Sequence, residues 1–105
     1  MLSQHYSPHT PVRLHATLDS TLIARLPADE AILLLRKPAT TPRRAKNIFW
    51  LSSKGRLAEI ARNLFGQLRR LDQGAWTCIH VELPGDAHGL APAIRDRLTR
   101  AAAKS

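Results

Sequence analysis

The spacing of apolar residues along the chain predicts four strands. Val12 to His15 alternates apolar and polar side chains, whereas Ala31 to Leu35 is a continuous apolar run. Alternation is typical of a strand with one buried face, and a short apolar run indicates a strand covered on both faces. We expect Ile48 to Leu51 to form another buried strand and Trp76 to Leu83 an alternating one. The continuous run should therefore lie at the centre of a sheet.

The clearest helix follows the third predicted strand. Its apolar residues recur at steps of three and four, so they share one face while the arginines of the same segment face water. These residues are Leu57, Ile60, Leu64, Leu68 and Leu71. Ser52 or Ser53 is a suitable cap for the start of the helix, and Gly74 is expected to end it in the left-handed conformation.

Two further helices complete the pattern. The leucines of residues 18–26 predict a short one that Thr17 or Asp19 caps and that stops before the next proline. The other spans residues 90–101 and contains Pro92, which a first turn tolerates because the amide there has no partner within the helix. Its buried stripe should comprise Leu90, Ile94, Leu98 and Ala101.

The resulting order of elements, β-α-β-β-α-β-α, predicts one α/β domain over residues 12–105. Helices between apolar strands favour a Rossmann-like three-layer α/β/α sandwich with a small, mainly parallel sheet. Residues 1–11 stand apart, because Pro8 and Pro11 exclude a helix and favour extended backbone. We interpret residues 1–11 as a linker or lid in front of the domain.

Size and composition restrict the function. The chain has 105 residues, of which 44% are hydrophobic, and this suffices for one packed core. An active site that closes over two substrates normally needs walls from a longer chain, so we assign no catalytic residue. Cys78 is the single cysteine, which excludes an internal disulfide and fits a reducing, cytoplasmic location. No apolar run approaches the ~20 residues that a membrane span requires.

The charge of the chain favours polyanionic partners. Sixteen Lys and Arg against eight Asp and Glu give a net charge of +8, which would raise encounter rates with RNA. Residues 36–46 form a predicted exposed loop with Trp50 near its end, and no aromatic residue lies within it. An ordinary solvated loop is therefore favoured over a nucleic-acid contact. The basic residues of this loop are Arg36, Lys37, Arg43, Arg44 and Lys46.

Other candidate sites have simpler structural explanations. Ser53 and Lys54 lie between a strand and a helix, as in an anion site, but they lack the spacing of a phosphate-binding loop, so capping is favoured. Cys78 and His80 share one face of a strand, yet the sequence offers no third ligand near them. Burial in the core is favoured over a metal or nucleophile role, and we assign no metal. Gly85 to Gly89 most simply forms a turn into the next helix.

The acidic residues offer no pair suited to acid–base catalysis. Asp29 and Glu30 are neighbours ahead of a predicted strand, and Asp96 is placed to pair with Arg100 along a helix.

Three short motifs occur in order along the chain. The first consists of HYSP at residues 5–8 followed by TPVRL at residues 10–14. The second is ARNLFGQLRRLD at residues 61–72, and the third is GLAPAIRDRL at residues 89–98. The first resembles the linker and following strand of two-domain L-threonylcarbamoyladenylate synthases, and the others are similar to the AxxLYxxLRxLD and GLGxAIxDRL patterns of their C-terminal domain. Ser7 stands where that family usually has alanine.

The resemblance implies that catalysis belongs to one domain and that this chain corresponds to another. In that family a YrdC-type catalytic domain condenses threonine, bicarbonate and ATP, with magnesium, to threonylcarbamoyl-AMP for the modification of tRNA. The linker lies over the catalytic site, and His5, Tyr6 and Pro8 match it, which implies a lid role for them. Met1 resembles a methionine inside that linker. ATP and magnesium would then belong to the absent catalytic domain, and no cofactor to this chain.

We therefore expect an accessory, regulatory domain that acts with a YrdC-type catalytic domain in tRNA threonylcarbamoyladenosine formation. Two alternatives stay open. The chain would otherwise be an independent basic module that binds tRNA or the threonylcarbamoyl transfer machinery, or a small nucleotide-binding domain that uses Ser52 to Gly55 or Gly85 to Gly89. A homodimer is compatible with each of these hypotheses.

Overall fold

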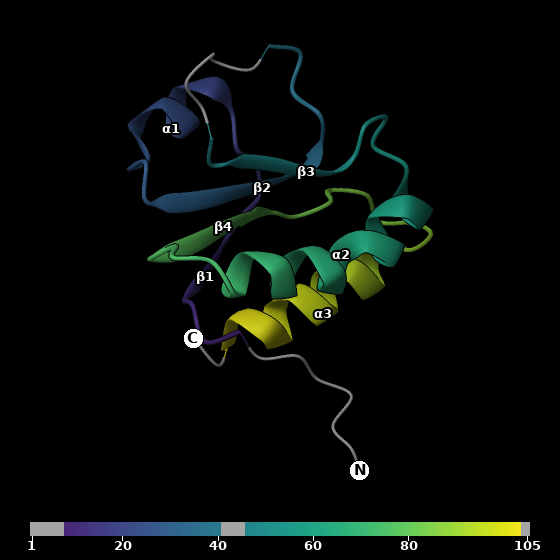
Figure 1. The fold of residues 1–105 in the computed structure, drawn as a ribbon. Coiled ribbons are helices and arrows are strands. Elements are labelled where there is room, and N and C mark those ends of the chain that lie inside the picture. The colour runs from purple at the N-terminus through teal and green to yellow at the C-terminus, as the bar shows by residue number, and fades with distance from the viewer. Residues whose placement is uncertain (1–7, 41–45, 104–105) are drawn as a thin grey trace.

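Four strands form one parallel sheet in the order β1-β4-β2-β3 (Figure 1). The computed structural model describes residues 8–40 and 46–103. The strands are β1 (Val12–His15), β2 (Glu30–Arg36), β3 (Ile48–Ser52) and β4 (Cys78–Glu82). Strands β2 and β4 are central, which confirms the predicted position of the apolar run at residues 31–35.

Helices cover both faces of the sheet. Helix α1 (Ser20–Arg25) lies on one face, and α2 (Leu57–Asp72) and α3 (Ala91–Ala103) lie on the other (Figure 1). The chain crosses the sheet in one direction from β1 to β2 and in the opposite direction from β3 to β4. Because both crossovers favour the right-handed form, their helices fall on opposite faces. The α/β class, the element order and the parallel sheet are confirmed.

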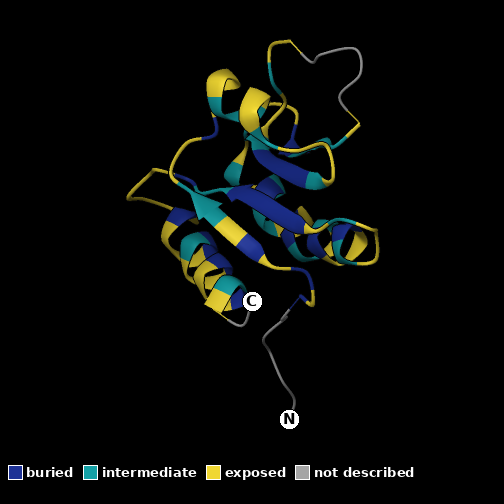
Figure 2. Cartoon of the chain, turned by 90° about the vertical axis from the view of Figure 1, so that its left-hand side faces the viewer, coloured by how far each residue is buried: buried dark blue, intermediate teal, exposed yellow. Residues whose placement is uncertain are grey.

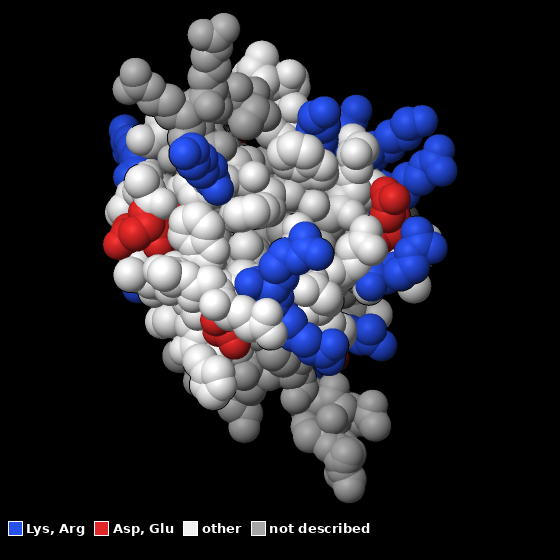
Figure 3. Space-filling model, in the orientation of Figure 1, with Lys and Arg blue, Asp and Glu red and all other residues white. Residues whose placement is uncertain are grey.

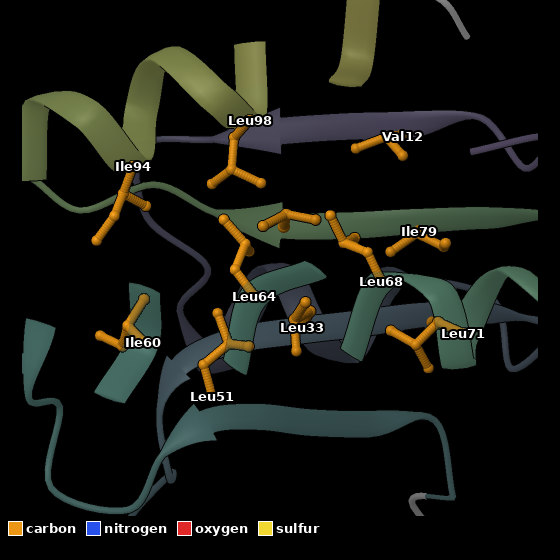
Figure 4. Close-up of a cluster of buried hydrophobic side chains, with 12 residues drawn as sticks. Val12, Leu33, Leu51, Ile60, Leu64, Leu68, Leu71, Ile79, Ile94 and Leu98 are labelled. Carbon is orange, nitrogen blue, oxygen red and sulfur yellow. The ribbon is translucent and has the colours of Figure 1, made fainter. Parts of the chain in front are cut away.

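The main core lies between the sheet and the two long helices (Figure 4). The predicted apolar stripe of α2 supplies four of its fully buried side chains, whereas Leu57 is only partly buried. Figure 2 shows the same arrangement as dark blue faces that point inward on the sheet and on the helices. The remaining large buried side chains come from the strands and α3, namely Val12, Leu33, Leu51, Ile79, Val81, Ile94 and Leu98.

The opposite face of the sheet is covered less completely. A second cluster joins Leu18, Ile32 and Leu34 to the apolar side of α1 and to Ile48 and Trp50. This cluster involves β2 and β3, so α1 covers that half of the face. The other half, on β1 and β4, carries polar side chains.

Several local predictions were wrong at the ends of elements. Leu90 precedes α3 and is 44% exposed, so Ala91 takes its place in the buried stripe. Gly74 does not have a positive φ; the described glycines that do are Gly55 and Gly89. Helix α2 instead ends with Gln73 in a right-handed conformation. A side chain at Gly74 would crowd the Trp76 ring, whose nearest atoms lie 3.0 Å from an ideal Cβ position.

Two of the predicted strands also differ in detail. Strand β3 lies at the sheet edge, and its first three residues are only half-buried rather than fully covered. Strand β4 begins at Cys78, two residues later than predicted, although the Thr77 amide already bonds to the Asp29 carbonyl ahead of β2. Of the predicted caps, Asp19 does cap α1 through the Leu22 amide. The prediction that Ser52 or Ser53 caps α2 was wrong, because the N-cap of α2 is Arg56, which makes no side-chain cap bond.

Candidate functional site

The N-terminal segment enters the domain beside the end of α2. The Asp72 carboxylate accepts hydrogen bonds from the backbone amides of His9 (3.0 Å) and Thr10 (2.8 Å). Asp72 is the last residue of α2, where the helix dipole disfavours a negative charge. The two amide bonds offset this cost. They fix the point at which residues 1–7 join the domain.

The residues predicted to form a lid all precede this anchor in the sequence. Pro8 is buried against the domain. His5 and Tyr6 lie outside the described residues. The structure therefore establishes where the segment is held, one residue after the HYSP motif.

A polar cluster lies on the same face of the sheet as α1, on β1 and β4 and at the first residue of β2. His80 of β4 lies between two neighbours, with its Nδ1 2.8 Å from Nε2 of His15 on β1 and its Nε2 2.6 Å from the carboxylate of Glu30 on β2. His80 is 4% exposed, and Cys78 beside it is 6% exposed. Among the described residues, every buried polar side-chain atom has a hydrogen-bond partner, so the cluster is internally satisfied.

Burial sets the ionisation of this cluster. It lowers the pKa of His15 below 6.5, and the charges of His80 and Arg13 lower it further. Burial also raises the pKa of the Cys78 thiol, and the Glu30 carboxylate acts in the same direction. Both groups therefore favour their neutral forms near neutral pH.

The expectation that no third group lies near Cys78 and His80 was wrong. Glu30 pairs in register with Cys78 across β2 and β4, and its carboxylate bonds to His80. The burial of Cys78 and His80 is confirmed. Alternation along each strand could have placed His15 and His80 on one face. Only the strand order, which brings together residues 50 and 65 positions apart, joins the three side chains.

Glu82 lies where the connections of adjacent strands diverge. The chain leaves β1 toward α1 and leaves β4 toward α3 on the other face, and such switch points are where open α/β sheets bind ligands. Here the Glu82 carboxylate accepts the amides of Leu18 (3.1 Å) and Leu35 (3.2 Å). A cavity of about 450 Å³ beside it, beneath α1, has mainly apolar walls with Arg36 at its rim.

The predicted basic loop is only partly described. Arg36, Lys37 and Lys46 are exposed, whereas Arg43 and Arg44 lie outside the described residues. The Lys37 ammonium lies 5.5 Å from the centre of the Trp50 ring, so the aromatic residue does accompany this segment. Figure 3 shows further Lys and Arg side chains spread over the face that carries α2 and α3.

In the turn before α2, the Ser52 hydroxyl bonds to groups of the same turn and of the helix. The Ser52 hydroxyl donates to the Glu59 carboxylate and accepts from the Arg56 amide at the start of the helix. Ser53 and Lys54 are exposed beside them. Ser52 thus binds the amide of Arg56, the N-cap residue of α2, and does not itself cap the helix. The Glu59 carboxylate would repel an anion here.

The loop after β4 is held by an arginine. Arg95 of α3 donates to the carbonyls of Pro84 (2.8 Å) and Asp86 (2.5 Å), and Gly89 turns the chain with a φ of +62°. Residues 85–89 thus form the expected turn into α3. The predicted pair between Asp96 and Arg100 is also present, at 3.3 Å on the helix surface.

The sequence profile described as "Threonylcarbamoyl-AMP synthase, C-terminal domain" matches residues 1–103. The chain belongs to this family. The match extends from the N-terminal segment through all three motifs, so the resemblance seen in the sequence is confirmed. A comparison with curated protein sequences gave no match.

A solved structure supports the fold of this family member. P. abyssi Sua5, in a crystal structure of its complex with L-threonine, aligns with a TM-score of 0.68 and 22% sequence identity. The alignment covers 97% of this chain but 31% of that chain. The chain therefore corresponds to about a third of that protein. Within the described residues, no helix is both long and apolar enough to cross a bilayer.

Proposed function

We propose that this C-terminal domain acts as an accessory, regulatory part of a threonylcarbamoyl-AMP synthase in tRNA threonylcarbamoyladenosine formation. The lid segment at residues 1–11 would cover the catalytic site of a YrdC-type partner domain through His5 and Tyr6, while Pro8, which is buried against this domain, would hold the segment beside its anchor. The family match over residues 1–103 supports this assignment. ATP and magnesium would be bound by the partner domain, and this chain would supply the cover and its anchor.

The anchor at Asp72 is the observation that carries the proposal. A segment that covers a site on another domain needs one fixed end, and the bonds from His9 and Thr10 to Asp72 provide it. His5 lies four residues before the anchored His9, and four extended residues span at most about 14 Å. The part of the catalytic site that His5 and Tyr6 cover must then lie near the end of α2, which restricts how the partner domain docks.

A reconstitution experiment tests the proposal. The chain is added to a YrdC-type catalytic domain, and pyrophosphate release from ATP is measured with threonine and bicarbonate. We expect the chain to change the rate or the KM for threonine, and Tyr6→Ala to reduce that effect. Asp72→Ala should reduce it as well, since it releases the anchor, whereas Asp96→Ala on the surface of α3 serves as the matched control. Equal rates with and without the chain, and no binding, would contradict the proposal.

Direct binding of tRNA is a second candidate, favoured by Lys37 over Trp50 beside the exposed Arg36. Phosphate contacts release counterions, so the affinity should fall steeply as salt is raised. Fluorescence anisotropy with labelled tRNA at increasing salt measures this. Lys37→Gln should weaken binding and Lys54→Gln, at the turn before α2, should leave it nearly unchanged. Absence of binding at low salt would exclude this candidate.

A further inference from the structure

Three side chains of different chemistry converge on the face of the sheet that also carries α1. The Glu30 carboxylate, the Cys78 sulfur and the His80 imidazole each present a ligand atom, and these atoms lie within 4.8 Å of one another. They come from two adjacent strands, with Glu30 in register with Cys78 and with His80 two residues further on the same face. Backbone pairing, rather than a loop, therefore holds the three groups together.

The combination of ligand types selects a particular class of ion. A thiolate and an imidazole favour zinc over magnesium or calcium, which prefer oxygen ligands only. Zinc binds these atoms at about 2.0 to 2.3 Å, so tetrahedral ligands lie roughly 3.3 to 3.8 Å apart. The ligand atoms can reach this spacing by small side-chain movements, because strand pairing already fixes their backbones. Three protein ligands and one open position are typical of a zinc site that also binds water or a further group.

The geometry points to a binding site for a divalent transition metal, zinc by its ligand chemistry, formed by Glu30, Cys78 and His80 with a water molecule as the fourth ligand. The Cys78 thiol loses its proton to become the thiolate ligand, and this proton leaves to solvent. The ion takes the place of the proton now between His80 Nε2 and Glu30, and that proton leaves to solvent as well. The site is separate from the anchor at Asp72 and does not depend on the proposed partner domain.

His15 acts as a positioning residue for the imidazole ligand. When Nε2 of His80 binds the ion, its remaining proton lies on Nδ1, which is 2.8 Å from His15 Nε2. A metal-binding histidine usually donates its other N–H to such an acceptor, which fixes the ring and its tautomer.

The burial of the three side chains and the access of solvent to them are also compatible with a bound ion. Cys78 and His80 are nearly enclosed, whereas the Glu30 side chain is 24% exposed and leads from the cluster to solvent. Arg13 opposes the ion, since its guanidinium lies beside the Cys78 thiol. Its side chain is exposed on the edge strand β1 and is free to turn outward as the ion enters. The alternative is a purely structural cluster, held by the hydrogen bonds of His80 alone.

Cobalt(II) titration of the 105-residue chain distinguishes these two cases. We expect one ion per chain, visible-region bands of a tetrahedral complex and a thiolate-to-cobalt charge-transfer band, with zinc displacing the cobalt. Cys78→Ser should remove the charge-transfer band, and Glu30→Gln should weaken binding more than about tenfold. His15→Ala should weaken it by about 10- to 100-fold, the effect typical of lost support for a ligand. His88→Gln, in the exposed loop before α3, is the matched control and should bind as the parent does.

Stability provides a second readout that does not depend on any single variant. Zinc that binds the folded chain must raise its melting temperature, and this rise should be absent for Cys78→Ser and present for His88→Gln. If Cys78→Ser does not fold, Glu30→Gln replaces it, because Glu30 is partly exposed. Absence of a charge-transfer band from the parent chain would overturn the proposal. Equal weakening by His88→Gln and the cluster variants would overturn it as well.

Discussion

Replacing Asp72 by alanine should loosen the N-terminal segment at a predictable cost. The change removes two acceptors, one for the partly buried amide of Thr10 and one for the exposed amide of His9. The His9 amide can bond to water instead, so only the Thr10 bond is fully lost, at about 1.5 to 3 kcal/mol for a charged acceptor. Relief at the end of α2 returns about 0.3 to 1 kcal/mol. The net loss of stability should be about 0.5 to 3 kcal/mol.

Hydrogen exchange locates the effect of this variant. The Thr10 amide should exchange much faster in Asp72→Ala, while amides in the middle of α2 change only with global stability. Asp72→Asn keeps one acceptor oxygen and should give an intermediate result. Asp96→Ala breaks a pair whose side chains are 57% and 59% exposed, so its effect on stability should be near zero. An unchanged Thr10 exchange rate in Asp72→Ala would refute the proposed anchor.

Further predictions concern the core, the turns and the histidine cluster. Leu68→Ala, at a position with no exposed surface, should cost about 2 to 5 kcal/mol in urea unfolding, whereas the exposed Leu90→Ala should change stability by less than about 0.5 kcal/mol. Gly55→Ala should destabilise by about 1 to 2 kcal/mol because its φ is +74°, while Gly66→Ala, with open space around it in α2, should stabilise by about 0.5 to 1 kcal/mol. The folded state lowers the pKa of His15, so the unfolded chain binds more protons, and stability should fall as pH drops below 6.5. Urea unfolding as a function of pH should show a shallower decline for His15→Gln, and an equal decline would contradict this assignment.

The fold was predictable where a periodic pattern extends over several turns or pairs. The stripe of α2 and the alternation of β1 each specify a buried face through repetition, and both are confirmed. The ends of elements have no such repetition. Leu90 fits the helical spacing of α3 but lies one residue before the helix starts, so its side chain does not follow the helical face. Gly74 fits a common end signal for α2, but its φ is not positive, and the Trp76 ring fills the space that a side chain there would need.

The candidate sites were less predictable, since they depend on contacts between distant parts of the sequence. Asp72 meets Thr10 across 62 positions, and Glu30 meets His80 across 50. Neither separation follows from a helical or strand period. The motifs did identify both parts separately, since LRRLD ends at Asp72 and the HYSP motif of the N-terminal segment lies just before Thr10. Only the structure relates the two through a pair of hydrogen bonds.

The number of helices on each face accounts for the polar residues of the sheet. A helix with its side chains is about 10 to 12 Å wide, and neighbouring strands are about 4.8 Å apart, so one helix covers roughly two strands. Two helices, α2 and α3, therefore cover all four strands on one face, and that face is apolar throughout. On the other face α1 covers β2 and β3, and the apolar cluster there ends with them. On the same face of the edge strand β1, where Arg13 is exposed, a large apolar residue would be exposed as well. Arg13, His15 and His80 occupy that half instead, and the satisfied hydrogen bonds of His80 allow it to be buried without a helix above it.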